Sequence, residues 1–232
     1  MTIFRSCSLP YLLVWFGRRN MMEKGEIIKR IEELSAKTKK RRFKQSAEIS
    51  INFKDLNMES AENKLNLNIL LPKGRNKEVN IGIFADGDMN VRAKKLSKFV
   101  LNKKELEEYS KKRRKMRKFA DLCYWFIAQP ELMPIIGRTW GIILGPRGKM
   151  PQPVPATADL DAIVERLKNT VRIRSKKNPT VNVPVGTEDM KPEDLAENIL
   201  AVMNGIERQI PPDKIRSVYF KTTMSRAIRL DR

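Results

Sequence analysis

Residues 79–101 read V-N-I-G-I-F-A-D-G-D-M-N-V-R-A-K-K-L-S-K-F-V-L, and they decide the fold class. The apolar run 79–85 has the length and composition of a buried strand, and the D-G-D sequence at 86–88 follows it as a turn. A short helix over 91–96 and a second apolar strand over 99–101 come next. A strand, a helix and a strand in succession are typical of a parallel sheet with crossover helices.

The same alternation continues toward the C-terminus. Residues 103–109 and the very basic stretch 111–118 have helical patterns, and 122–128 is a fully apolar strand. Pro130 starts another helix, because proline is tolerated in the first turn. We therefore predict that residues 76–169 form an inserted three-layer α/β (Rossmann-like) domain.

This α/β block ends in a glycine- and proline-rich loop over 145–155, G-P-R-G-K-M-P-Q-P-V-P. Its two glycines and four prolines restrict the backbone so strongly that we expect neither helix nor strand there. A rigid loop that carries cations is suited to presenting N–H groups and positive charge to an anion. The alternative, which composition alone favours, is a linker stiffened by proline. The candidate residues of this inserted-domain loop are Gly145, Arg147, Gly148 and Lys149.

The N-terminal segment has a different pattern. Apolar residues at helical spacing predict a helix over 23–36. Strict alternation of apolar and polar residues then predicts half-buried strands over 45–53 and 65–71. Residues 75–77 read as a hinge into the α/β block.

The C-terminal segment returns to short strands. Strands begin at Val171 and Thr180, and Pro192 is the first residue of an amphipathic helix. Two further strands cover 216–221 and 227–230. We predict that residues 22–75 and 170–232 build one discontinuous α+β domain that flanks the inserted one.

The first residues do not fit either pattern. The apolar run 9–16 is too short to span a bilayer, and no cleavage site of the secretory type follows it. Met21 and Met22 stand directly before the first helix. We therefore expect residues 1–21 to be a non-native upstream extension, which an intact-mass measurement on native protein can test.

Composition points to a polyanionic partner. The chain has a formal net charge of +20 and a pI of about 10.1, which favours nucleic acid, with an anionic membrane surface as the rival. The membrane alternative lacks an amphipathic basic helix with a sufficient apolar face. The chain has no histidine and two cysteines, so His-based metal sites, histidine-dependent catalysis and a disulfide framework are excluded. We expect no metal and no cofactor.

Three basic runs, 37–44, 111–118 and 172–177, carry much of this charge. Lysine and arginine neutralise phosphates, and each such contact steepens the salt dependence of binding. The run at 111–118 is either a solvated helix face or a binding surface. Accessory contacts are expected from Lys40, Arg41, Lys176 and Lys177.

The run that ends at Phe43 differs, because an exposed aromatic ring and then Gln45, Ser46 and Glu48 on the polar face of a strand follow it. Amides, hydroxyls and carboxylates can read base edges and 2′-hydroxyl groups, which RNA offers. The T-T-M-S turn at 222–225 supplies further hydroxyls. If both ends of the chain share one domain, these two segments line one surface.

Several motifs resemble the archaeal form of large-subunit ribosomal protein one, the "L-one" family. They are F-x-Q-S-x-E at 43–48, L-P-x-G-R at 71–75, I-L-G-P-R-G-K-M-P-x-P-V-P at 143–155, P-V-G at 184–186 and S-V-Y-x-K-x-T-M at 217–224. The resemblance covers residues 22–231. It implies one discontinuous and one inserted domain, no enzymatic activity and a monomer when free.

The resemblance also implies partners and a site. The expected partners are large-subunit rRNA in the mobile side stalk of the cytoplasmic ribosome, exit-site tRNA whose release is assisted, other ribosomal components, and the leader of the chain's own mRNA, whose translation is repressed. The family pattern continues with Gly-Pro where this chain has Ser225-Arg226. The RNA-binding residues carried over are Arg42, Phe43, Ser46, Glu48, Ser217, Thr223, Met224 and Ser225.

A second reading, from another class, is an enzyme that binds a phosphate ligand in the α/β insert, with Asp86, Asp88 and Arg147 at the site. The absence of histidine and of a phosphate-binding fingerprint argues against it. Tight, stoichiometric binding of a nucleotide would favour this alternative.

Overall fold

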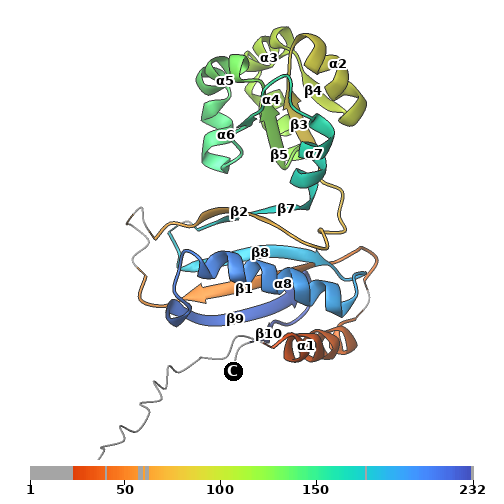
Figure 1. The fold of residues 1–232 in the computed structure, drawn as a ribbon, viewed down its shortest axis with the longest axis vertical. Helices are drawn as coiled ribbons and strands as arrows, with labels where there is room; N and C mark the ends of the chain where they lie inside the picture. Colours follow the sequence, from red (N-terminus) through yellow and green to blue (C-terminus); the bar gives the residue numbers. More distant parts are fainter. Residues whose placement is uncertain (1–22, 40, 57–59, 61–62, 176, 231–232) are drawn as a thin grey trace, which may run out of the picture.

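The computed structural model describes residues 23–39, 41–56, 60, 63–175 and 177–230. The predicted extension at 1–21 lies outside this range. Figure 1 shows two parts, one above the other, that are joined by two stretches of chain. We call residues 23–75 and 170–230 the terminal part, and residues 76–169 the middle part.

The described residues of these parts form eight α-helices and ten strands. The α-helices are α1 (Lys24–Lys37), α2 (Gly87–Leu96), α3 (Lys103–Ser110), α4 (Arg113–Leu122), α5 (Met133–Thr139), α6 (Gly141–Arg147), α7 (Leu160–Asn169) and α8 (Pro192–Glu207). The strands are β1 (Ser46–Phe53), β2 (Asn66–Leu70), β3 (Ile81–Phe84), β4 (Phe99–Leu101), β5 (Trp125–Ala128), β6 (Gln152–Pro153), β7 (Thr170–Arg174), β8 (Thr180–Thr187), β9 (Ile215–Thr222) and β10 (Ile228–Arg229). Short 3-10 helices cover Pro130–Leu132 and Pro212–Lys214.

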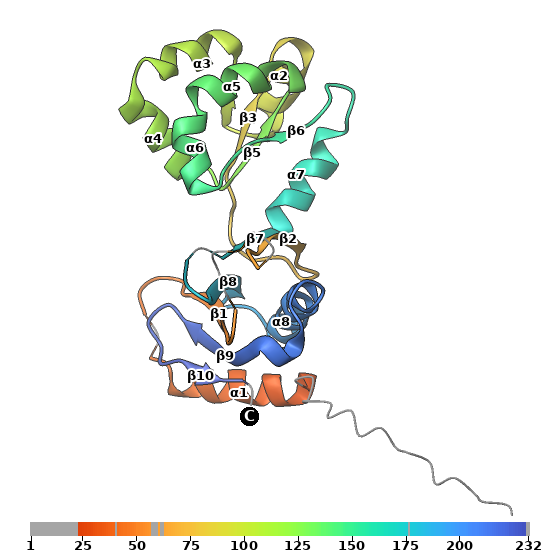
Figure 2. The same ribbon diagram turned by 90° about the vertical axis from the view of Figure 1, so that its left-hand side faces the viewer.

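The terminal part contains an antiparallel sheet in the order β10-β9-β1-β8. The N-terminal strand β1 therefore lies between two strands from the C-terminal segment. Figure 2 shows α8 on one side of this sheet and α1 beneath it, with the opposite face away from both helices. The predicted alternation explains why the helices cover one face of the sheet, because β1 buries every second side chain and leaves the others partly exposed.

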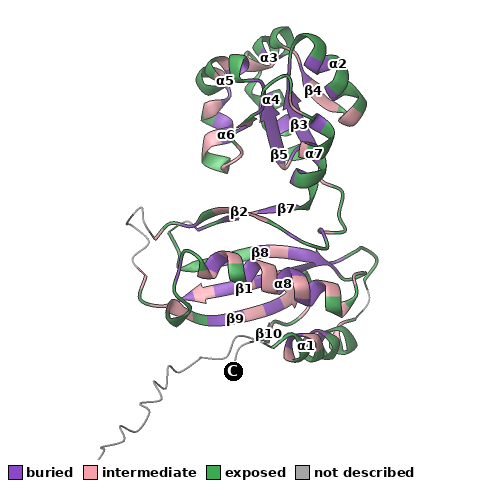
Figure 3. Ribbon diagram, viewed as in Figure 1, coloured by how far each residue is buried: buried purple, intermediate pink, exposed green. Residues whose placement is uncertain are grey.

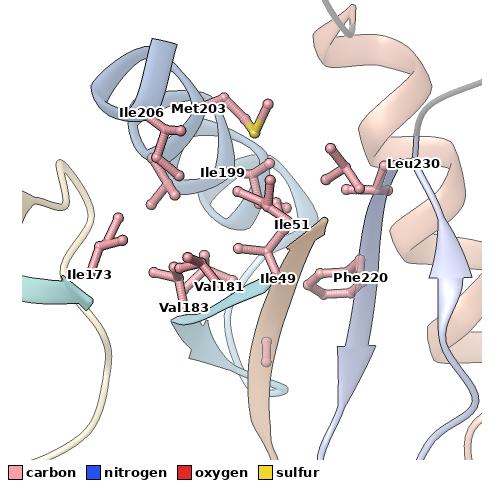
Figure 4. Close-up of a cluster of buried hydrophobic side chains, with 14 of the residues drawn as sticks. Ile49, Ile51, Ile173, Val181, Val183, Ile199, Met203, Ile206, Phe220 and Leu230 are labelled. Carbon is pink, nitrogen blue, oxygen red and sulfur yellow. The ribbon is translucent and has the colours of Figure 1, made fainter. Parts of the chain in front are cut away.

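The core of the terminal part lies between this sheet and the helices. Figure 4 shows Ile49 and Ile51 of β1 against Ile199 of α8, with Phe220 of β9 beside them. Helix α1 adds Ile27, Ile31 and Leu34. All buried residues of this cluster belong to the terminal part, so the two ends of the chain share one apolar core.

A second, two-stranded antiparallel ribbon pairs β2 with β7. It lies between the sheet of the terminal part and the middle part (Figure 1). The chain leaves this ribbon at a fixed bend, because Gly74 has a φ of +64° and a side chain there would meet Asn169. Buried Asn198 of α8 secures the bend by donating to the carbonyl oxygens of Gly74 and Val185.

The middle part contains a parallel sheet in the order β4-β3-β5-β6. Helices α3 to α6 pack on one face around Phe84 and Phe126, and α2 and α7 pack on the other around Ile83 and Trp125. Strands β3 and β5 are buried along their whole length (Figure 3), as expected for a parallel sheet covered on both faces. The structure is thus a mixed α/β fold that includes a parallel sheet.

Several expectations about local structure are wrong. Residues 145–147 complete helix α6 and residues 152–153 form β6, although we expected neither helix nor strand there. Pro146 lies one residue before the end of this helix, and Gly148 caps the helix with a φ of +67°.

Two other element boundaries also differ. The 86–88 segment is not a separate turn, because the Asp86 carboxylate accepts from Gly87 N and caps α2 directly. Strand β5 begins only at Trp125, because residue Leu122 still belongs to α4 and is exposed.

Candidate RNA-binding surface

Gln45 joins the two ends of the chain. Its side chain is fully buried, whereas we expected it on the polar face of a strand. Its Oε1 accepts from Met224 N at 3.1 Å and from the Thr222 hydroxyl at 3.2 Å, and its Nε2 donates to the Glu188 carboxylate at 2.9 Å. Gln45 is therefore a structural hub, because a buried amide is stable only when its bonding groups are satisfied.

The residues around this hub form an exposed edge. The Ser46 N–H donates to the Thr223 hydroxyl at 3.1 Å, and the Thr223 N–H donates to Ser46 O at 3.1 Å. Phe43 and Met224 are 50% and 58% exposed and lie in the two segments that Gln45 connects. We call Arg42, Phe43, Ser46, Thr223 and Met224 the edge residues.

The register of β1 and β9 extends this edge into a polar sheet face. Glu48 pairs with Lys221, Ser50 with Tyr219, and Asn52 with Ser217. Because side chains alternate across a strand, these pairs and the Ser46–Thr223 contact lie on the face opposite the apolar core. We call this surface the open face.

Two residues of the open face, Tyr219 and Lys221, were not among the candidates. Both are partly exposed, so one aromatic ring and one cation stand beside Ser50 and Glu48. The alternation of polar and apolar residues within β9 was the signal that would have identified them.

Ser217 lies apart from the edge residues. It is 6% exposed, and its hydroxyl accepts from Asn52 Nδ2 at 3.0 Å. Six residues of strand separate it from Thr223, a distance of roughly 20 Å. Exposed Lys177 lies in the loop at the same distant end, where Phe53 N donates to Pro179 O. The hydrogen bond from Asn52 shows that Ser217 helps to orient the Asn52 side chain.

The basic residues before Phe43 are exposed where they are described. Arg41 and Arg42 precede it directly, and Lys44 pairs with Asp189 at 3.0 Å. Lys40 and Lys176, both expected as accessory contacts, lie outside the described residues.

Ser225 stabilises its own turn. Its hydroxyl accepts from Thr222 N at 2.8 Å, and its N–H donates to Thr222 O at 3.2 Å. Among the described residues, positive φ values outside glycine occur only at Asp55 and Asn76. Serine therefore fits this position without left-handed backbone strain, which explains how the turn tolerates it in place of glycine.

The two cations at the end of α6 and just after it form contacts within the fold. The Arg147 guanidinium pairs with Asp121, and Lys149 Nζ donates at 2.7 Å to the carbonyl oxygens of both Ala120 and Cys123. Gly148 contributes its carbonyl oxygen to the Arg172 guanidinium. Burial lowers the pKa of Lys149, and the neighbouring Arg147 charge adds to this effect. These contacts fasten α4 and β7 to the loop.

The residues of the enzyme alternative do not meet in a site. Asp86 caps α2, and Arg147 is engaged with Asp121. Within the described ranges there is no group of three or more His, Cys, Asp or Glu residues that could hold a metal ion. In the same part of the chain, no helix is both long and apolar enough to cross a membrane.

Comparison with known proteins supplies the family. The sequence model of the "Ribosomal protein L1p/L10e family" matches residues 34–226. The chain is 45% identical to the large ribosomal subunit protein uL1 of Pyrococcus horikoshii, across 92% of this chain and 99% of the relative. It is 42% identical to the uL1 protein of Methanobrevibacter smithii, across 88% of this chain and 98% of the relative.

These matches show a ribosomal protein. The chain belongs to the ribosomal protein L1p/L10e family, and its relatives include archaeal uL1 proteins. Members of this family are structural components of the ribosome, so the chain is not an enzyme. This confirms the resemblance found in the motifs.

Proposed function

We propose that the chain binds large-subunit rRNA through the open face and the edge residues, and thereby forms part of the mobile side stalk of the large ribosomal subunit. The observation that supports this most is the hydrogen bonding of Gln45 to the 222–224 turn, because it joins the segment that carries Phe43 to the segment that carries Met224. Phe43 stacks on an unpaired base, and Arg41 and Arg42 neutralise phosphates. Glu48 accepts a hydrogen bond from a base amino group or a 2′-hydroxyl group.

The two parts of the molecule are, in this proposal, two domains. The terminal part would be the discontinuous α+β rRNA-binding domain, and the middle part would be the inserted domain. Every buried residue of one cluster lies in the terminal part and every buried residue of the other two lies in the middle part, so each part has an apolar core of its own, as separate domains do. Calorimetry should then resolve two unfolding transitions, and one sharp transition at every scan rate would contradict the division.

The experiment compares the edge residues on two RNAs. Phe43→Ala and Thr223→Val should each weaken binding to a fragment of the stalk rRNA by about 1–3 kcal/mol, because each removes a specific contact. Binding to a random RNA duplex should change much less. Leu70→Ala is a matched control, because Leu70 of β2 is as exposed as Phe43. Equal loss on both RNAs would reject the site.

Translational repression follows if the leader of the chain's own mRNA offers the same RNA surface. The leader and the stalk fragment should then compete for one site, and the Phe43→Ala protein should fail to repress translation of its own message in a cell-free extract. Repression that survives this change would separate the two activities. Assistance in the release of exit-site tRNA is part of the same proposal and depends on the stalk position.

A further inference from the structure

Helix α4 carries a dense, exposed positive charge that the proposed rRNA site does not use. Seven of the eight residues 111–118 are lysine or arginine. The exception, Met116, is buried, and all seven cationic residues are exposed. The basic helix patch comprises Lys111, Lys112, Arg113, Arg114, Lys115, Arg117 and Lys118.

The patch is held on a rigid support. Phe119 lies beneath it, with its ring centroid 5.8 Å from that of Trp140 and 6.0 Å from that of Phe126. Lys149 fastens the other end of α4 through the carbonyl oxygens of Ala120 and Cys123. The cations therefore project from a helix that is fixed in the core, and a ligand need not order it first.

The charge of the patch is not neutralised within the fold. None of its seven side chains forms an ion pair with a described residue. The nearest acidic residues lie on α3 or at the end of α4: Glu105 is bound back to Asn102 N, and Asp121 pairs with Arg147. This leaves the two carboxylates of Glu107 and Glu108 to offset the seven positive charges of the patch.

The arrangement is also unfavourable for an isolated helix. Like charges three or four residues apart repel one another, as at Arg113 and Arg117 or Arg114 and Lys118. The first turn of α4 contains no acidic residue, so its cations face the positive end of the helix dipole. A polyanion that lies along the helix relieves both effects, whereas solvent relieves them only in part.

Figure 2 places this patch relative to the proposed rRNA site. Helix α4 lies at the left of the middle part, and the face of the terminal sheet that points away from α8 lies on the same side. Helix α4 and the open face therefore lie on the same side of the molecule but belong to different parts of it.

We propose that the basic helix patch binds the phosphodiester backbone of a second stretch of folded RNA while the open face holds the stalk rRNA. This extends the proposed function. The patch has no exposed apolar residue within 111–118, and the exposed Leu122 of α4 lies one turn beyond it, whereas protein interfaces depend on clustered apolar anchors. Closely spaced cations alone suit phosphates, which position a nucleic acid without reading its sequence.

The test uses the full chain saturated with the stalk rRNA fragment, so that the open face is occupied. A fluorescent, fully base-paired RNA hairpin of unrelated sequence is then titrated by anisotropy at several salt concentrations. The variant Arg113→Gln/Arg114→Gln/Lys118→Gln should weaken hairpin binding about tenfold and lower the salt slope by about two to three. Its affinity for the stalk fragment should change less than about twofold, because the patch does not touch that RNA.

A matched control removes equal charge elsewhere in the middle part. Lys94→Gln/Lys95→Gln/Lys98→Gln changes three exposed lysines at or beyond the end of α2 and should leave hairpin affinity within about threefold of the wild type. Equal loss in both triple variants would overturn the proposal, since net charge alone would then explain the binding. Equal loss of both RNAs in the α4 variant would also overturn it.

Two further outcomes are distinct from these. Displacement of the hairpin by polyglutamate at matched charge concentration would assign the patch to an acidic protein and refute RNA as its ligand. If the wild-type chain fails to bind the stalk fragment, the proposed function fails by itself. Hairpin binding that depends on α4 in that case would still support the patch.

Discussion

At the scale of single residues, Gln45 holds together the edge that we propose as the RNA-binding site. It satisfies three groups from two separate segments, at Thr222 and Met224 in one turn and at Glu188 after β8, and it has no exposed surface of its own. A side chain in this position does not contact RNA. It orients residues of the proposed site, so its effect on RNA affinity should pass through the 222–225 turn.

Replacing Gln45 with leucine should therefore reduce both stability and RNA affinity. Leucine leaves Met224 N–H and the Glu188 carboxylate without this partner, at a cost of about 1–3 kcal/mol each when they stay buried. Urea unfolding and stalk-fragment binding should both show the loss. Gln209→Leu is the control, because Gln209 is exposed at the end of α8. Unchanged affinity in the Gln45→Leu protein would contradict the role of the hub.

Cys123 gives a prediction about pH. Burial raises the pKa of its thiol to about 12 from an ordinary value of 9.0, and the nearby Lys149 charge acts in the opposite direction. The folded pKa lies above the unfolded one, so the neutral thiol contributes fully below pH 9. This contribution is lost as the pH rises toward 12, at up to about 1.4 kcal/mol per pH unit. Unfolding free energies measured from pH 8 to 11 should fall less steeply in Cys123→Ala.

The sequence alone predicted the positions of some of these residues but not of others. It predicted that Phe43 and Thr223 share one surface, because both lie in short polar stretches beside predicted strands. It placed Gln45 wrongly, on the polar face of a strand, and it did not show that Ser217 is buried. The chain pattern shows that such residues are polar, but their burial depends on Glu188 and Asn52, which come from distant segments.

At the scale of elements, the segment 145–149, which covers the end of α6 and the two residues after it, explains how α4 is held. A glycine- and proline-rich stretch with two cations looked suited to an anion, but Arg147 and Lys149 bind Asp121 and the end of α4 instead. Lys149 provides the cation that the carbonyl groups at a helix C-terminus favour.

Lys149→Met should consequently loosen α4 and lower the unfolding free energy by about 1–3 kcal/mol, because two carbonyl oxygens lose a charged donor. Hydrogen exchange should become faster for residues 119–123. Lys104→Met, an exposed change in the first turn of α3, should alter neither quantity by more than about 0.5 kcal/mol. Equal exchange rates in the two variants would contradict the role of Lys149.

Most elements could be predicted from periodicity. The two-residue period of β1 and the helical period of α1 and α8 were sufficient, since each element buries one side. Helix α6 escaped prediction because Gly145 and Pro146 have poor helical propensity, which packing of Ile143 and Leu144 in the core outweighs.

At the scale of the whole molecule, β7 connects the two parts through Arg172. Its guanidinium lies 4.1 Å from the ring centroid of Trp125 in β5, and it donates to the Gly148 carbonyl oxygen. The Trp125 indole N–H donates in turn to Thr170 O at 3.3 Å. A cation over an aromatic ring contributes about 0.5–2 kcal/mol, so this contact biases the orientation of the middle part.

Arg172→Met should broaden the distribution of distances between the parts, as measured by energy transfer between dyes at residues 95 and 208. Stalk-fragment affinity should change by less than about threefold, because the edge residues are untouched. Lys177→Met, which alters an exposed residue beyond β7, should leave the distribution unchanged. A narrow distribution in the Arg172→Met protein would contradict the role of this contact.

The change from antiparallel to βαβ patterning in the sequence predicts where each part of the chain begins. It does not predict which strands pair with one another. Sequence gave no register, and β1 pairs with β8 and β9, which lie more than a hundred residues away.

The central claim is that both ends of the chain present one surface to folded RNA, and hydroxyl-radical footprinting of side chains tests it most directly. Phe43, Met224 and Met150 are 50%, 58% and 40% exposed, so all three should be oxidised in the free protein. Adding the stalk rRNA fragment should protect Phe43 and Met224 together, at the same RNA concentration, and leave Met150 reactive. Protection of only one end of the chain, or of Met150 alone, would contradict the account.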